Sequence, residues 1–219
     1  MSAYPRILPV GEAAFTVEFG NRVDARLTAR VHALDALLTP DTLPGFIETV
    51  PTYRALLVRY DPCVCPADEV EAALGAHLDA WAEIEPPEGR LIEIPVRYGG
   101  DAGPDLASVA QHAGLSPAEV IRLHTAPTYR VAMLGFAPGF AYLQGLDPRI
   151  AAPRLETPRT CVPSGSVGIA GGQTGVYALD TPGGWRILGR TDLALFDPAR
   201  EAPFLLQAGD RVRFIAEDG

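Results

Sequence analysis

The sequence GFAPGFAYLQGLDPRIAAPRLETPRTCVPSGSVGIAGGQTGVYALDTPGGWRILGR, from Gly135 to Arg190, says most about the fold of this chain. It contains 11 glycines and six prolines among 56 residues, which is too many for regular helices. Many short strands joined by glycine and proline turns are typical of a β-barrel or a β-sandwich, and we predict one of these two folds. The expected strands here and downstream are Ser166–Ala170, Val176–Leu179, Trp185–Leu188, Leu193–Phe196 and Arg211–Ile215.

Four elements are expected between residue 90 and this segment. Ser116, Pro117 and Glu119 form a capping box, with a serine at the N-cap and a glutamate three residues later, and predict a helix that runs to His124. A second helix is expected just before this one. The remaining predicted elements are the helix Pro104–Ala113 and the strands Leu91–Val96 and Thr128–Leu134.

The first 82 residues alternate between strand and helix patterns. Apolar residues recur at helical spacing in residues 23–38 and again in residues 66–82. The resulting order, ββαββα, predicts a small open sheet with both helices packed on one face. The expected strands are Ile7–Pro9, Ala13–Phe19, Phe46–Val50 and Tyr53–Tyr60.

The charge distribution indicates two domains. Residues 1–89 hold six arginines and 14 acidic residues, whereas residues 90–219 hold 12 arginines and 13 acidic residues. The acidic segment from Ala82 to Arg90 carries two consecutive prolines, as a stiff linker would. We therefore predict an α+β protein with an α/β domain over residues 1–84 and a β-barrel domain over residues 90–219.

Composition excludes several classes of function. The chain has 219 residues, a net charge of −9 and 18 basic residues, all of them arginine. The negative charge disfavours nucleic-acid and membrane-surface binding. The absence of lysine excludes a Schiff base and a complete Walker A motif. The sequence has no stretch of 18 apolar residues and no signal-peptide pattern at its start, so we expect a cytoplasmic protein.

The sequence predicts no metal site. Cys63 and Cys65 form a pair that no second cysteine or histidine pair at ligand spacing complements, and Cys161 stands alone. Structural roles are the favoured interpretation of the four histidines. They are His32, His77, His112 and His124.

The segment from Gly135 to Arg190 also holds the candidate binding residues. Its aromatic residues alternate with glycine and proline, which is typical of a rigid loop beside a ligand, although the same aromatics could simply close the end of a barrel. Its arginines suit a carboxylate or a phosphate, unless they pair with local acids. No catalytic residue follows from the sequence, because Ser166 lacks the glycine of a nucleophile elbow and no His/Asp set accompanies it. The predicted ligand-binding residues are Phe136, Phe140, Tyr142, Arg154, Arg159, Ser166, Gln173, Trp185, Arg186 and Arg190.

Several stretches resemble a known family. Similarity to the family of the 5-oxoprolinase B subunit, which includes allophanate hydrolase subunit 1 and the sporulation kinase inhibitor KipI, is seen in GFAPGFAYLQGLDP, PRLETPRTCVPSGSVGIAGGQTGVYALDTPGGWRILGRT, LFDP and QAGDRVRF. The resemblance covers about residues 5–215. It implies that the β-barrel is cyclophilin-like and follows a small α/β domain.

The resemblance also implies an activity and partners. The B subunit works with a C subunit, which is related to allophanate hydrolase subunit 2, and with a separate A subunit. Such complexes hydrolyse 5-oxo-L-proline to L-glutamate with ATP, which implies a nucleotide and Mg²⁺ bound somewhere in the complex. We therefore expect a hydrolase subunit that is inactive without its partners.

Two alternatives stay open at this point. The barrel could bind a histidine kinase and inhibit it, as the likeness to KipI allows. The chain could instead belong to a system that acts on allophanate or another urea-derived amide.

Overall fold

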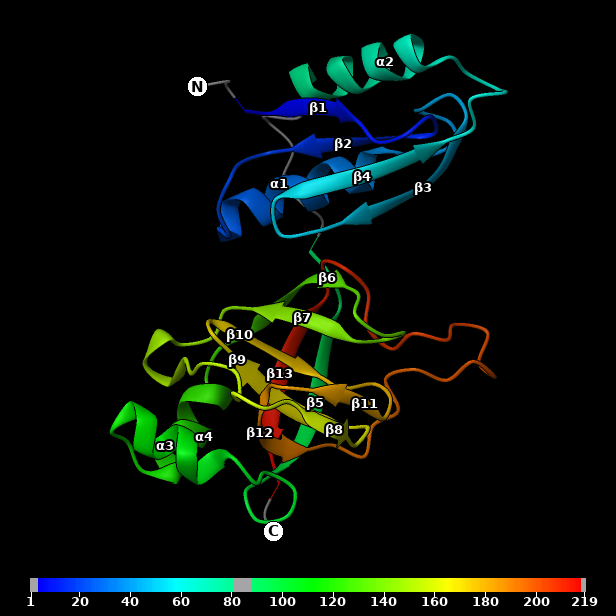
Figure 1. The fold of residues 1–219 in the computed structure, drawn as a ribbon. Coiled ribbons are helices and arrows are strands. Elements are labelled where there is room, and N and C mark those ends of the chain that lie inside the picture. The colour runs from blue at the N-terminus through cyan, green and yellow to red at the C-terminus, as the bar shows by residue number, and fades with distance from the viewer. Residues whose placement is uncertain (1–3, 81–87, 218–219) are drawn as a thin grey trace. The chain divides into compact units, whose positions relative to one another are not determined.

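The computed structural model describes residues 4–80 and 88–217 and divides into two compact units, Met1–Glu88 and Gly89–Gly219 (Figure 1). Each unit has its own buried hydrophobic cluster. Most of the predicted linker lies outside the described residues, so its stiffness stays a prediction. None of the described helices is both long and apolar enough to cross a membrane.

The first unit is a four-stranded antiparallel sheet with strand order β1-β2-β4-β3 and two helices. Alternate residues of the two central strands are buried, because one face of the sheet is covered. In the register of these strands Phe15 lies opposite Val58, and Val17 lies opposite Leu56. The elements are β1 (Arg6–Pro9), β2 (Ala14–Glu18), α1 (Ala25–Leu37), β3 (Phe46–Pro51), β4 (Ala55–Tyr60) and α2 (Ala67–Ala80).

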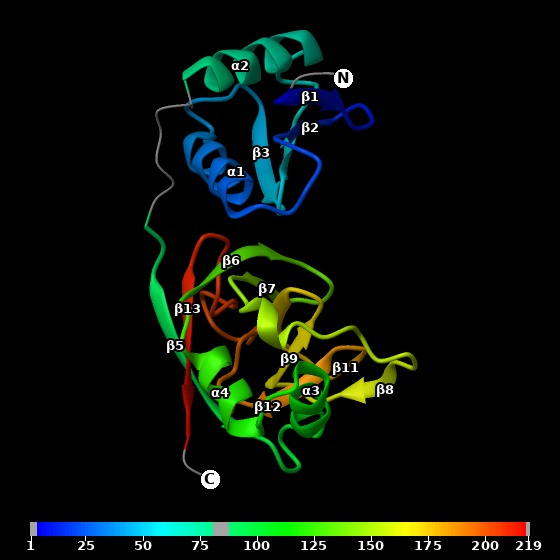
Figure 2. The same ribbon diagram turned by 90° about the vertical axis from the view of Figure 1, so that its left-hand side faces the viewer.

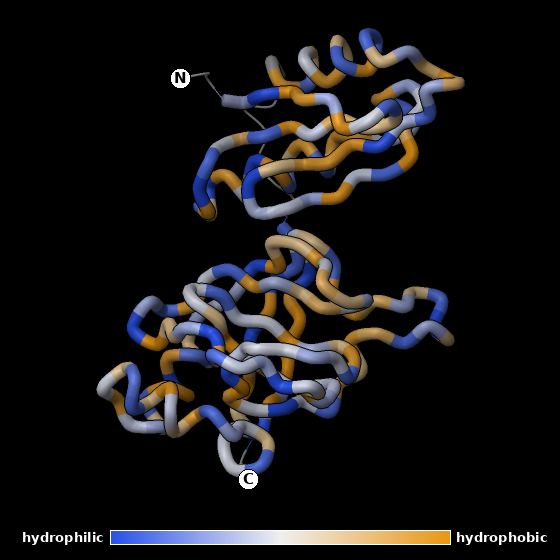
Figure 3. Tube along the Cα trace, in the orientation of Figure 1, coloured by the Kyte–Doolittle hydropathy of each residue, from blue (hydrophilic) through white to orange (hydrophobic). Residues whose placement is uncertain are grey.

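Both helices pack on the same face of this sheet, as the sequence predicts (Figure 2). Leu34 of α1 and Leu74 of α2 belong to one buried cluster with the inward residues of β2 and β4. The strands carry a mixture of hydrophobic and hydrophilic residues along their length (Figure 3). This mixture is expected where only one face of a sheet is covered.

The second unit is built on a closed barrel of seven strands, in the order β10-β7-β6-β13-β5-β12-β9. The chain's final strand closes it by pairing in parallel with the unit's first strand. A two-stranded ribbon of β8 and β11 accompanies the barrel. The barrel strands are β5 (Leu91–Tyr98), β6 (Tyr129–Leu134), β7 (Ala141–Gln144), β9 (Ser166–Ala170), β10 (Gln173–Val176), β12 (Arg186–Arg190) and β13 (Arg211–Ala216), and the ribbon strands are β8 (Arg159–Val162) and β11 (Thr181–Gly183).

Two short helices contribute to the barrel core. Helices α3 (Leu106–Ala113) and α4 (Pro117–Thr125) pack together, and their buried residues join the barrel cluster. The predicted capping box is present: the backbone N–H of Glu119 donates to Ser116 Oγ, and the Glu119 carboxylate accepts from the backbone N–H of Ser116. A 3₁₀ turn, η2 (Pro148–Ile150), contacts both helices.

His124 at the end of α4 lies inside this core. Its Nδ1 is 2.7 Å from the Tyr98 hydroxyl, and its Nε2 is 2.9 Å from Thr174 Oγ1. Thr174 Oγ1 donates its own hydrogen to the carbonyl of Gly168, so it accepts from Nε2 and the imidazole takes the Nε2–H tautomer. Burial lowers the pKa of His124 to about 3, and the ring stacks on Phe214 as a neutral core residue.

The structure corrects several strand predictions. The ribbon strands β8 and β11 were not expected from the sequence. Ala141–Gln144, which we expected to be loop, is strand β7. The strand expected at Val176–Leu179 lies earlier, at Gln173–Val176, because the turn at Gly171 with φ of 55° starts the hairpin there. Leu193–Phe196 is not a strand. Only an isolated bridge joins Phe196 to Phe204, since the nearby prolines have no N–H to extend a ladder.

Candidate functional site

Aromatic side chains enclose a pocket in the barrel unit. Its volume is about 120 Å³, and we call it the aromatic pocket. Five of its lining residues are among those predicted from the sequence. The lining residues are Phe136, Phe140, Tyr142, Arg154, Tyr177, Gly183, Gly184 and Trp185.

Phe140 is the centre of the aromatic packing. Its ring centroid lies 4.9 Å from that of Tyr142, 5.1 Å from that of Tyr177 and 5.4 Å from that of Trp185, each in an edge-to-face arrangement. Such pairs stabilise a fixed geometry beyond the area that they bury. Phe140 and Trp185 are 2% and 5% exposed, so the pocket wall is part of a small core.

Phe136 stands at the mouth of this pocket in a strained conformation. Its φ is 68°, a value that side chains other than glycine rarely adopt, and the N–H of Ala137 donates to the carbonyl of Gly135 across it. The Phe136 side chain is 62% exposed, and its ring centroid lies 5.4 Å from that of Phe140. An exposed ring held by a backbone that costs on the order of 1–3 kcal/mol is typical of a binding site.

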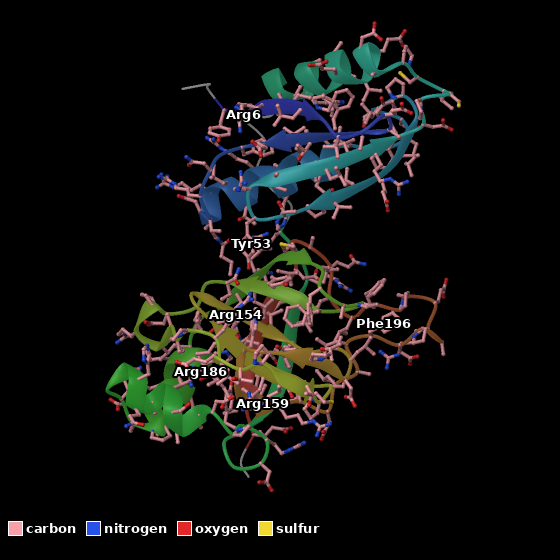
Figure 4. All side chains as sticks on the ribbon, in the orientation of Figure 1. Arg6, Tyr53, Arg154, Arg159, Arg186 and Phe196 are labelled. Carbon is pink, nitrogen blue, oxygen red and sulfur yellow. The ribbon has the colours of Figure 1, made fainter. Side chains whose placement is uncertain are left out.

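Arg154 is fixed through the backbone on both sides. The carbonyl of Pro153 accepts a hydrogen bond from Arg186 Nε at 2.9 Å, and the N–H of Leu155 donates to the carbonyl of Gly184 at 2.8 Å. The Arg154 side chain itself is exposed and makes no hydrogen bond or ion pair with the described residues. Arg154 is one of the lining residues of the pocket, and the donors of its guanidinium are available (Arg154 is labelled in Figure 4).

Tyr177 supplies the second polar group. Burial raises the pKa of its hydroxyl. The backbone N–H of Trp185 and the charge of Arg154 partly offset this increase. The oxygen accepts a hydrogen bond from that N–H. The hydroxyl consequently stays protonated and has a hydrogen to donate.

A second, smaller pocket of about 70 Å³ holds three other predicted residues, and we call it the Arg159 pocket. Here two of the arginines already have protein partners. Arg159 binds Asp105 at 2.8 Å, and Arg190 Nε donates to the carbonyl of Ser164 at 3.0 Å. The lining residues are Asp101, Ala102, Pro104, Arg159, Val162, Pro163, Ser166, Ile187 and Arg190.

The structure thus divides the ten predicted residues. Five line the aromatic pocket, and Arg159, Ser166 and Arg190 line the Arg159 pocket. Arg186 lies in neither, because it binds the Pro153 carbonyl and Ser108 Oγ, and Gln173 is a half-buried residue at the start of β10. Ligand contact stays a prediction for all ten.

Two residues of this region do not follow from the sequence reasoning. Tyr177 falls inside an expected strand, where an aromatic residue is ordinary. Asp105 falls inside the expected helix Pro104–Ala113, but it binds Arg159 with one oxygen and accepts from the N–H of Ile187 at 2.7 Å with the other. No local signal identifies these partners, which lie 54 and 82 positions away.

Neither pocket fits a nucleotide or a metal ion. Pockets for drug-sized ligands run to roughly 300–1,000 Å³, and both volumes are well below this range. In the described part of the chain, no three His, Cys, Asp or Glu side chains gather as metal ligands would. Cys63, Cys65 and Cys161 are free thiols.

Comparison with known proteins shows the family. The carboxyltransferase domain family, subdomain C and D, matches residues 5–206. The chain is 44% identical to the 5-oxoprolinase B subunit of Bacillus subtilis, over 98% of this chain and 94% of that protein. It is also 44% identical to the 5-oxoprolinase B subunit of Escherichia coli O157:H7, over 95% of this chain. The chain belongs to the family of the 5-oxoprolinase B subunit.

Solved structures agree with this membership. The crystal structure of TTHA0988 has a TM-score of 0.82 and 41% identity, covering 94% of this chain. This chain spans only 40% of the length of that protein. An uncharacterised protein of Pyrococcus horikoshii is 48% identical over 97% of this chain, with a TM-score of 0.58.

More distant relatives share the fold of this family. The Kluyveromyces lactis urea amidolyase has a TM-score of 0.72 at 20% identity and covers 96% of this chain. The Saccharomyces cerevisiae urea amidolyase is 25% identical, and the match covers 13% of that long protein. The aromatic pocket and the Arg159 pocket both lie within the residues that the family match covers.

Proposed function

We propose that this chain is the B subunit of a complex that hydrolyses 5-oxo-L-proline to L-glutamate with ATP. The observation that carries the proposal is the 44% identity to a 5-oxoprolinase B subunit over nearly the whole of both chains. The aromatic pocket suits this function, because a small lactam with one carboxylate needs a flat apolar wall and one cationic group.

The chain requires partners in this proposal. The aromatic pocket is lined by aromatic residues, glycines and one arginine, so it offers no nucleophile and no carboxylate or imidazole base. These residues can bind, orient and exclude water. We therefore assign this chain a binding role and place the hydrolytic groups on the A and C subunits.

We also assign the nucleotide to the partners, because the described residues offer no cluster of metal ligands for Mg²⁺ and the aromatic pocket is too small for ATP. ATP, when bound in the complex, would supply the activation that a lactam carbonyl lacks. No step of that activation is assigned to a residue of this chain.

A urea-related amide is the second candidate. Urea amidolyases are similar to 93% of this chain, but at 24–25% identity, well below the identity to the 5-oxoprolinase proteins. The higher identity favours 5-oxoproline as substrate. The third interpretation, inhibition of a histidine kinase, stays a prediction.

A substrate panel tests the proposal. This chain is mixed with the A and C subunits and ATP, and hydrolysis of 5-oxoproline, allophanate and urea is measured with this chain present or omitted. We expect glutamate from 5-oxoproline only when the chain and ATP are both present. If the complex releases ammonia from allophanate or urea but no glutamate from 5-oxoproline, the chain acts on a urea-related amide instead. No turnover of any substrate by an assembled complex would contradict an enzymatic role.

A further inference from the structure

Arg154 differs from the other arginines around it. Arg159, Arg186 and Arg190 donate to Asp105, to the Pro153 carbonyl and to the Ser164 carbonyl. Arg154 makes no such bond with the described residues, although its neighbours on both sides are fixed. The backbone beside Arg154 is fixed, and its guanidinium, which has no partner among the described residues, is available to an external anion.

The polar groups of the pocket beside Arg154 suit an anion. None of its eight lining residues is acidic, and the Tyr177 hydroxyl has a hydrogen to donate. The guanidinium of Arg154, with no acidic residue beside it in the lining, favours a carboxylate over an ammonium ion. The remaining surface is the flat faces and edges of Phe136, Tyr142 and Trp185, which select a planar ligand.

The size of the pocket further restricts the ligands that it can hold. A volume of about 120 Å³ holds one small ring and excludes a peptide segment or a nucleotide. Gly183 and Gly184 keep one wall open, and a Cβ at Gly183 would lie 2.4 Å from the Tyr177 hydroxyl. A side chain there would displace the Tyr177 donor from its position.

We propose that the aromatic pocket is the binding site for the substrate's carboxylate-bearing five-membered ring, with the guanidinium of Arg154 on the carboxylate. This inference rests on the proposed function and deepens it by locating the substrate on this chain. Tyr177 donates to an oxygen of the ligand, and the ring lies against Trp185. Arg186 and Arg159 are positioning residues, since they hold the Pro153 carbonyl and the Trp185 carbonyl respectively.

Trp185 provides a direct binding readout. The chain has two tryptophans, so replacing Trp81 by Phe leaves Trp185 as the single indole reporter in the pocket. In this background, 5-oxo-L-proline should change the fluorescence saturably, and 2-pyrrolidinone, which lacks the carboxylate, should bind at least 10-fold more weakly. Arg154→Met should weaken 5-oxoproline binding by about 30-fold, as expected for the loss of a charge-assisted bidentate bond.

The matched control is Arg213→Met. Arg213 lies on β13, pairs with the exposed Glu93 and lines neither of the two pockets described above, so this variant removes the same charge away from the ligand. Its binding curve should equal that of the parent chain. Gly183→Ala should weaken binding while the charge stays unchanged.

Kinetics of the assembled complex supply the second readout. With Arg154→Met, the KM for 5-oxoproline should rise by about 30-fold, whereas Arg213→Met should leave it unchanged. If Arg154→Met and Arg213→Met behave alike in both the fluorescence and the kinetic measurement, the pocket assignment is wrong. If the Arg154→Met complex produces glutamate with an unchanged KM, only the assignment of the substrate to the aromatic pocket is wrong. If the parent complex makes no glutamate, the proposed function is wrong, and the fluorescence titration alone then tests whether 5-oxoproline binds in the pocket.

Discussion

At the scale of single residues, one residue type performs three tasks in the barrel unit. Arg159 neutralises a nearly buried carboxylate, Arg186 and Arg190 bind backbone carbonyls, and Arg154 presents its donors to a pocket. Arginine suits all three tasks because its planar guanidinium stays charged and offers five donors. The three tasks differ in the group that each guanidinium contacts: a carboxylate, a backbone carbonyl or the open pocket.

The Asp105–Arg159 pair should matter for stability. The side chain of Asp105 is 11% exposed, and its second oxygen accepts from the backbone N–H of Ile187, so its removal leaves that buried donor without a partner and a partly buried guanidinium without its counter-charge. We expect Asp105→Ala to lower the free energy of unfolding by about 2–4 kcal/mol in urea titrations. Asp192→Ala, which breaks the exposed pair with Arg97, should cost less than about 1 kcal/mol. Equal costs would show that Asp105 is a surface partner.

His124 should make stability depend on pH. Its pKa is lowered to about 3 in the folded chain, below the value of about 6.5 in an unfolded chain, so the unfolded state binds the proton more readily. The stabilisation is complete above pH 6.5 and is lost as the pH falls toward 3.

The size of this loss follows from proton linkage. Between pH 7 and pH 5 the parent chain should lose about 2 kcal/mol more unfolding free energy than His124→Gln, which carries no titrating group. Chemical denaturation at the two pH values measures the difference. Parallel losses in both proteins would mean that His124 is protonated or exposed in the folded state.

The candidate site shows how far the sequence leads at this scale. The aromatic residues and arginines are predictable, because they are concentrated between glycines and prolines in one segment. Which arginine remains unpaired is not predictable, since it depends on Asp105 and on carbonyls far away in the sequence. Tyr177 is not predicted, because its role arises only when Gly183 of β11 and Trp185 pack against it.

At the scale of elements, the turn before β7 shapes the pocket. Phe136 has a φ of 68°, so its strained backbone lowers the stability of the fold independently of what its ring contributes to packing. Phe136→Ala and Phe136→Gly both remove the ring, and only the second relieves the strain. We expect the glycine variant to be more stable than the alanine variant by about 1 kcal/mol, measured by urea unfolding. At an ordinary position glycine would be the less stable of the two, so the opposite sign would contradict this conformation.

The elements themselves are predictable where a single pattern dominates. Both helices of the first unit follow from their helical spacing, and α4 follows from its capping box. Strand β7 is not predicted, because four residues between glycines carry too short an alternation to detect. The expected strand at Leu193–Phe196 is wrong, because apolar residues there pack onto the barrel without a continuous ladder.

At the scale of the whole molecule, the chain consists of two units with separate cores. All residues of the aromatic pocket lie in the second unit. We therefore expect a fragment of residues 89–219 to unfold cooperatively and to retain the 5-oxoproline affinity of the full chain. Circular dichroism in urea and Trp185 fluorescence measure the two properties.

A shorter fragment provides the control. Residues 99–219 lack β5, which pairs with both β12 and β13, so this fragment should not form the barrel. Cooperative unfolding of the shorter fragment, or none in the longer one, would contradict the assignment of the barrel as an independent unit.

The sharpest test of the proposed function is a titration of this chain into fixed amounts of the A and C subunits with saturating ATP and 5-oxoproline. The initial rate of glutamate release should rise from near zero and reach a plateau at a fixed molar ratio, as expected for a required component of the complex. A rate that is already maximal without the chain, or that stays at zero at every ratio although the three proteins assemble, would contradict it.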